Sequence, residues 1–94
     1  MKLEFTSLVF KEKNMYVAYC PELDVSSCGR DVDESRKNLV GAVSVFLEET
    51  KNLGTLNEIL EEAGYIPSDK KRSMWSPPDL ILTERQEVKF PSGG

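Results

Sequence analysis

The chain has 94 residues, of which 39% are hydrophobic and 30% charged, the size and composition of one small folded domain. Twelve Lys and Arg against 16 Asp and Glu give a net charge of −4, which disfavours binding to nucleic acid and favours a basic protein as partner. Histidine is absent, which excludes imidazole-dependent catalytic triads and most zinc sites. The pattern contains no signal peptide and no membrane-spanning run, so we expect a cytoplasmic protein.

Three strands are predicted near the N-terminus. Residues 2–11 and 15–20 are rich in aromatic and β-branched side chains and are separated by a short polar turn, which is typical of a β-hairpin. Asn14 is suited to a positive φ in that turn. Pro21 ends the second strand because it has no N–H to donate. Residues 25–28 then predict a short third strand.

The most regular pattern in the chain predicts a helix from Asp31 to Leu53. Asp31 can accept hydrogen bonds from the free amides at the helix start, and Glu34 three residues later completes a capping box. Gly54 ends the helix in a left-handed conformation. Apolar residues recur on one side and predict the face that packs on the sheet: Val32, Leu39, Val43, Phe46 and Leu53.

A shorter helix is predicted between Thr55, which repeats the capping pattern, and Gly64. It completes a core of three strands and two helices over residues 1–66. The rest of the single domain (1–94) divides into a linker, a last strand and a frayed tail: residues 67–78, 79–90 and 91–94.

These elements predict an α+β fold: a small twisted sheet of three N-terminal antiparallel strands plus a C-terminal strand, with one long and one short helix on one face. Tyr16 and Tyr19 must point to opposite sides of their strand, so the second sheet face also carries large side chains. No second helix layer is predicted to cover that face. We therefore expect a homo-oligomer, a dimer or tetramer, or an obligate protein partner.

Residues 16–29, YVAYCPELDVSSCG, and the helix opening DVDES at residues 31–35 resemble the HicB antitoxin family. The resemblance covers roughly residues 1–50. It implies a partial RNase H-like fold of three strands, a helix and a further strand. It also implies a function, which is to bind and silence HicA, a small basic mRNA interferase toxin, by occlusion.

The sequence departs from the family at Arg30-Asp31, which replace the usual Asp-Thr, at the short hairpin turn, which lacks its customary Gly, and in two further respects. Cys28 stands where Gln is usual. Longer members continue into a DNA-binding helix-turn-helix or ribbon-helix-helix, and nothing after Gly64 is long or basic enough for one. We therefore expect no direct nucleic-acid binding by this chain.

The candidate partner-binding residues are Tyr16, Tyr19, Glu22, Asp24 and Trp75. Glu22 and Asp24 lie in the sharp loop after Pro21 and can present acidic groups to a basic partner. In the alternative reading, Leu23 enters the core and the two acids simply face water. Trp75, in the predicted linker, can anchor a partner or fold back over the second helix.

An RNase H-like nuclease would need several carboxylates around two divalent ions. The acidic residues near the sheet and helix are more readily explained as solvated charges and helix N-terminal groups: Glu4, Glu22, Asp24, Asp33, Glu34 and Glu49. We therefore expect a non-enzyme with no catalytic residues, metal or cofactor. Two alternatives to the antitoxin remain: an orphan HicB-like scaffold or adaptor without a toxin, and the metal-dependent nuclease.

Three small residues, Cys20, Cys28 and Gly41, have structural interpretations. Cys20 and Cys28 lie near the ends of neighbouring strands and are interpreted as small core residues, because two sulfurs do not complete a zinc site. Gly41 lies in the middle of the long helix, off its apolar face, where it costs about 1 kcal/mol relative to Ala. Either a neighbouring chain approaches there or a stable helix tolerates it.

Overall fold

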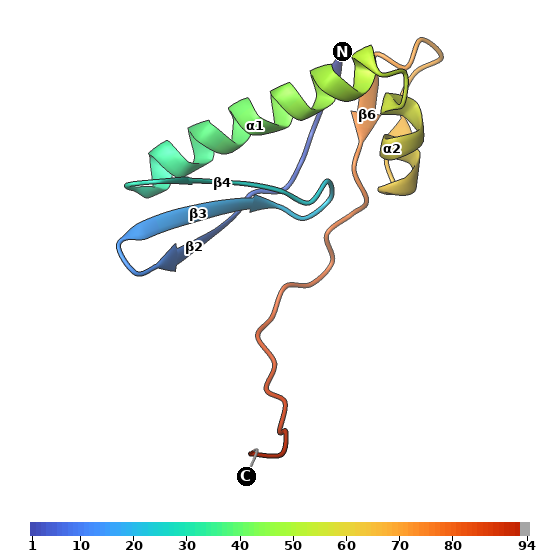
Figure 1. Ribbon diagram of the computed structural model, residues 1–94. Coiled ribbons are helices and arrows are strands. Elements are labelled where there is room, and N and C mark those ends of the chain that lie inside the picture. Colours follow the sequence, from blue (N-terminus) through green and yellow to red (C-terminus); the bar gives the residue numbers. More distant parts are fainter. Residues whose placement is uncertain (93–94) are drawn as a thin grey trace.

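Three antiparallel strands form the first sheet of the computed structural model, which describes residues 1–92 (Figure 1). The strands are β2 (Leu8–Glu12), β3 (Met15–Cys20) and β4 (Val25–Gly29), in the order β2-β3-β4. The hairpin between β2 and β3 is confirmed. Its positive φ of 55° falls on Lys13, however, and not on Asn14 as the sequence indicated.

The long helix α1 (Val32–Asn52) lies across one face of this sheet (Figure 1). Its N-cap is the predicted one, because the Asp31 carboxylate accepts a hydrogen bond of 2.7 Å from the backbone N–H of Glu34. The Glu34 side chain reaches back one residue further than in a capping box and accepts from the N–H of Arg30 at 3.1 Å. The start of α1 is thus fixed directly after β4.

The apolar face of α1 is buried only in its middle. Leu39 is 0% and Val43 2% exposed, and Phe46 packs against them. Val32 and Leu53, predicted on the same face, are 44% and 76% exposed. Near the two ends of α1 the buried positions are polar instead, because Ser35 is 0% and Thr50 6% exposed.

A second sheet joins the two ends of the chain, in the order β1-β6-β5. It consists of β1 (Lys2–Leu3), β6 (Met74–Ser76) and β5 (Ile66–Pro67). The pair β1–β6 is parallel and the pair β5–β6 antiparallel. The prediction of one sheet with a C-terminal strand was therefore wrong in detail: over residues 1–92 the fold is α+β with two helices and two sheets of three strands each.

The predicted first strand over residues 2–11 is interrupted at residues 4–7, between β1 and β2. The reason is a side chain from the loop after β3. The Glu22 carboxylate accepts the backbone N–H of Thr6 at 2.9 and 3.0 Å, so that amide does not enter a strand ladder. The break directs β1 away from the first sheet and toward β6.

The short helix α2 (Leu56–Glu62) places Leu56 and Leu60 in the core, 6% and 0% exposed. Gly54 has the expected positive φ, 78°. Thr55 does not cap α2, since its hydroxyl instead donates to the carbonyl of Thr50 at 3.4 Å.

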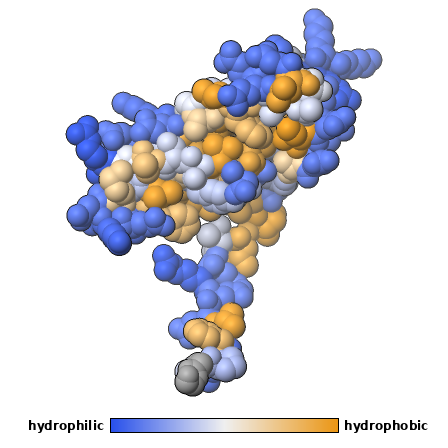
Figure 2. All heavy atoms as spheres, viewed as in Figure 1, coloured by the Kyte–Doolittle hydropathy of each residue, from blue (hydrophilic) through white to orange (hydrophobic). Residues whose placement is uncertain are grey.

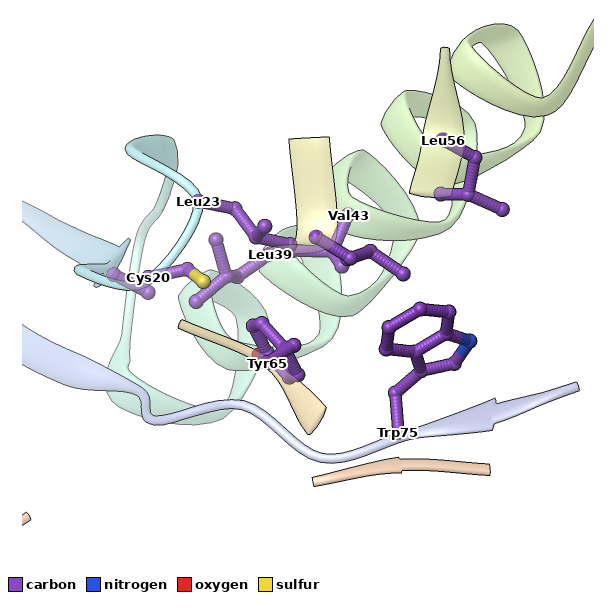
Figure 3. Packing of buried hydrophobic residues seen from close by; sticks show 9 residues of the cluster. Cys20, Leu23, Leu39, Val43, Leu56, Tyr65 and Trp75 are labelled. Carbon is purple, nitrogen blue, oxygen red and sulfur yellow. The ribbon is translucent and has the colours of Figure 1, made fainter. Parts of the chain in front are cut away.

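Figure 3 shows the buried cluster in which the two sheets meet the helices. Leu39 and Val43 of α1 lie between Cys20 and Leu23 on one side and Trp75 on the other. The buried Leu23 agrees with the alternative reading of its loop, although its acidic neighbours Glu22 and Asp24 do more than face water. The core therefore unites both sheets, and the predicted linker is part of it.

Residues 79–90, predicted as the last strand, are in no strand and run away from the body (Figure 1). We call residues 79–92 the tail. The radius of gyration is 16.2 Å, against about 12 Å expected for a compact chain of this length. The large apolar side chains of the tail are 63% to 88% exposed: Leu80, Ile81, Leu82, Val88 and Phe90. The predicted frayed end at 91–94 includes residues 93 and 94, which lie outside the described residues.

Candidate protein-binding face

The strand register decides which side chains lie on each side of the first sheet. Directly paired residues share a face, and Val9 pairs with Ala18 on the side of α1, where Ala18 is fully buried. The positions between them point away from α1. We call that side the outer face; its residues are Leu8, Phe10, Glu12, Met15, Val17, Tyr19, Ser26 and Cys28.

The outer face is apolar and open. Phe10 is 47% and Met15 40% exposed, while Leu8, Val17 and Tyr19 are half-buried against one another. Among the helices and strands of residues 1–92, α1 alone packs extensively on this sheet, and it lies on the opposite side (Figure 1). A contiguous apolar face of this kind is typical of a surface that another polypeptide covers.

Two of the predicted residues, Tyr19 and Asp24, meet at the edge of this face. The Tyr19 hydroxyl donates to Asp24 Oδ1 at 2.9 Å, and this hydrogen bond raises the pKa of the tyrosine. Asp24 adopts a φ of +55°, a conformation that Asp tolerates better than most residues. The phenol is thereby held beside a carboxylate at the rim of the apolar surface.

Tyr16 lies on the other side of the sheet. It pairs with Lys11 and Gly29, and the Lys11 ammonium sits 5.8 Å from the centroid of its ring. The prediction that Tyr16 and Tyr19 point to opposite sides is confirmed by this register. Tyr16 therefore does not belong to the outer face.

Glu22 is turned toward its own chain. Besides the Thr6 amide, its carboxylate accepts the Thr6 hydroxyl at 2.6 Å and the Cys20 thiol at 3.5 Å. Burial opposes ionisation of this carboxyl, but the hydrogen bonds from Thr6 outweigh it and lower the pKa of Glu22. Its acceptor positions are used to hold residues 4–7 against the β3–β4 loop rather than offered to a partner.

This arrangement predicts a pH dependence of stability that Glu22→Gln should weaken. The folded-state pKa of Glu22 is depressed, so its stabilisation is complete above the unfolded value of about 4.3 and is lost as pH falls through the folded value. At pH 7 the variant should lose about 1 kcal/mol, because an amide oxygen replaces only part of the carboxylate's hydrogen bonding. Between about pH 5 and 3 the unfolding free energy of the variant should fall less than that of the wild type.

Urea unfolding at pH 7 and pH 3.5 measures this difference. Glu62→Gln is the matched control, since it makes the same chemical change at an exposed carboxylate at the end of α2. Parallel pH profiles for the wild type and Glu22→Gln would contradict the assigned role.

Trp75 lies in the core, 2% exposed, and is not free to anchor a partner in this structure. Its indole N–H donates to the carbonyl of Arg72 at 3.1 Å. The Arg72 guanidinium lies 5.8 Å from the centroid of the ring. Of the two predicted roles, the structure agrees with folding back: β6 carries Trp75 beneath α1 and next to α2 (Figure 3).

The two cysteines lie on opposite faces of the first sheet. Cys20 is fully buried on the side of α1, and burial raises the pKa of its thiol to about 11. Cys28 pairs with Val17 on the outer face and is exposed, so its interpretation as a core residue was wrong. The register separates the two thiols by the thickness of the sheet, and both are free.

Sequence reasoning did not identify Phe10, Met15, Val17 and Cys28 as parts of the surface. The alternation of the strands did contain this information. Once Tyr19 is placed on the outer face, every second residue of β3 lies there too, and the hairpin pairing assigns their partners in β2 to the same face. Residue type drew attention to the tyrosines and acids instead.

Within residues 1–92, no group of three or more Cys, Asp or Glu side chains is arranged to hold a metal ion. The same part of the chain contains no helix that is long and apolar enough to cross a membrane. The site is thus defined by shape and surface chemistry: a small α+β protein with one apolar sheet face open and acidic groups at its rim. No family model, curated protein or solved structure matches this chain.

Proposed function

We propose that this chain is a HicB-like antitoxin, with a partial RNase H-like fold, that binds and neutralises a small basic HicA-like mRNA interferase in the cytoplasm. The resemblance of residues 16–35 to that family motivates the proposal. The structural observation that carries it is the open outer face, because an antitoxin of this kind needs a surface for another protein and no catalytic centre.

The composition of the outer face fits a protein partner. Aromatic and Met side chains are enriched at the centres of protein interfaces, and Phe10, Met15 and Tyr19 provide them here. Glu12 and Asp24 place negative charge at opposite ends of the same surface. An apolar centre with an acidic rim matches a partner whose own surface is basic and binds RNA.

Inhibition by occlusion requires only that the two proteins stay bound. A toxin that cleaves mRNA must present positive charge to the phosphates. An acidic protein seated on that surface excludes RNA by volume and competes for the same cations. The electrostatic part of such binding weakens as salt is added, whereas the apolar centre maintains the contact.

Co-expression with any small basic protein encoded beside this chain tests the proposal. We expect growth arrest by that protein to be relieved and the two chains to co-elute in size-exclusion chromatography. Phe10→Asp should abolish both effects, since it buries an unpaired carboxylate at the centre of the contact. The matched control is Val45→Asp, which makes the same kind of change on α1 at a position 54% exposed. Absence of relief and of a complex with the wild-type chain would overturn the antitoxin assignment.

A further inference from the structure

The tail has the side-chain pattern of a strand but no sheet to join in its own body. Its apolar residues Leu80, Leu82, Val88 and Phe90 stand at even-numbered positions, with Glu84 and Gln86 between the two pairs, and most of the odd-numbered positions are polar. Figure 2 shows hydrophobic side chains where the tail leaves the body and again near its tip. Alternation over this length is typical of a strand with one buried face. The tail is exposed, and no surface among the described residues of its own body buries its apolar side chains.

The body has a strand edge that is equally unpartnered. β2 is the outermost strand in the order β2-β3-β4, and within residues 1–92 no strand pairs with its second edge. The exposed edge is five residues long and begins with the apolar Leu8, Val9 and Phe10. Free backbone N–H and C=O groups along such an edge accept an added strand.

The pairing of β1 with β6, in the other sheet, supplies the offset that we carry over to that addition. The two strands run parallel with Met74 opposite Lys2 and Trp75 opposite Leu3, a constant offset of 72 residues. β2 follows β1 in the chain, just as the tail follows β6. The same offset can therefore be continued from the first pair of segments to the second.

Continuing the offset brings like side chains together. Leu80 falls opposite Leu8, and Leu82 falls opposite Phe10. Leu8 and Phe10 lie on the outer face, so the apolar side of the tail would extend that face by one strand. The apolar alternation of the tail and the carried-over register thus both favour the free edge of β2 as the site where the tail pairs.

The tail does not reach this edge in its own molecule. It leaves the body through Pro77 and Pro78, whose rings fix φ and supply no N–H. Pro78 is packed closely on Gly64, because a Cβ on Gly64 would lie 2.8 Å from the Pro78 ring. This contact fixes the exit, and the tail runs outward from there (Figure 1).

We propose that two copies of this chain exchange their tails, with residues 80–84 of each adding as a parallel strand to β2 of the other. One copy offers one tail and one β2 edge, so reciprocal exchange pairs both and closes as a two-fold dimer. Because Pro77 and Pro78 direct the tail away from its own body, the tail pairs with β2 of the second copy rather than with β2 of its own chain. This dimer uses strand edges and does not depend on the proposed toxin.

Cross-linking distinguishes exchange from closure within one chain. Phe10→Cys and Leu82→Cys, each in a Cys28→Ser background, are placed on differently tagged chains, co-expressed and treated with a short bismaleimide. We expect a cross-linked species joining both tags, at twice the chain mass of 10.6 kDa. Val45→Cys paired with Leu82→Cys is the control and should give none, since Val45 lies exposed on α1. Absence of the mixed-tag species, or a cross-link formed only within a chain carrying both cysteines, would overturn the exchange.

Sedimentation of the full chain gives a second measurement. The wild type should be a dimer, and Leu82→Pro should raise its dissociation constant about a hundredfold, because proline removes a ladder donor. Folding is not at risk, as the tail extends away from the body. Ser92→Pro, beyond the exchanged segment, should leave the dimer intact. A wild-type monomer, or a Leu82→Pro dimer of unchanged affinity, would contradict the proposal.

Discussion

Replacing Gly29 by Ala should destabilise the fold by about 3 kcal/mol, at the upper end of the usual range for overpacking. A Cβ at this position would lie 2.5 Å from the backbone nitrogen of Ser35 and 2.9 Å from the backbone carbon of Glu34. These atoms belong to the first turn of α1 and cannot move like a flexible side chain. Close contact between the end of β4 and the start of α1 therefore requires glycine. Denaturant unfolding measures the loss.

Gly41→Ala is the matched control, because it makes the same chemical change where a Cβ would meet nothing within 4 Å. It should stabilise the protein by about 1 kcal/mol through helix propensity. A small loss for Gly29→Ala, below about 1 kcal/mol, would contradict the close packing of β4 on α1. If Gly41→Ala instead weakened self-association, Gly41 would mark the approach of a neighbouring chain.

Trp75→Ala should cost about 3–5 kcal/mol, as expected for truncating a large buried aromatic side chain. The indole is 2% exposed and packs in the core with Leu56 and Val43. Its loss would leave a cavity where β6 meets both helices. Chemical denaturation followed by far-ultraviolet circular dichroism gives the change, since the variant lacks the chain's single tryptophan.

The adjacent Met74→Ala is the control, since Met74 is 49% exposed and should cost less than about 1 kcal/mol. In the wild type, the fluorescence of Trp75 should be that of a buried indole and shift to the red on unfolding. A Trp75→Ala variant as stable as the wild type would mean that residues 67–78 are the flexible linker that their composition indicated.

The elements that could be predicted are those set by short-range interactions. The hairpin of β2 and β3 follows from alternation across a two-residue turn, and the start of α1 follows from a cap only three residues long. Even in these two elements, the turn conformation and the hydrogen-bond partners depended on surrounding residues. The positive φ fell on Lys13, and Glu34 bonded to Arg30.

The second sheet could not be predicted because its strands are very short and its partners are distant. Leu3 and Trp75 are 72 residues apart, and no local pattern in the two residues of β1 indicates that pairing. The break before β2 likewise depends on Glu22 reaching Thr6 across 16 residues. Trp75 therefore resembled an exposed anchor in a Pro- and Lys-rich segment until its packing was known.

The existence of an open sheet face was predicted, but only some of the residues predicted for the site lie on it. An uncovered second sheet face was expected, and the structure has one, with Tyr19 and Asp24 at its edge. Tyr16 falls on the opposite side, because strand parity rather than residue type decides the face. Glu22 was selected for its place in the loop after Pro21 and Trp75 as a candidate anchor in the predicted linker, and each is engaged within the chain.

Thiol labelling of Cys28 tests most directly whether another protein covers the outer face. Cys28 is exposed on that face, whereas Cys20, the only other thiol, is buried with a pKa of about 11. We expect Cys28 to react readily in the chain alone and at least about tenfold more slowly in a complex with a small basic protein that binds this chain. Labelling at the same rate in a stable complex would show that the partner binds elsewhere and would contradict the account.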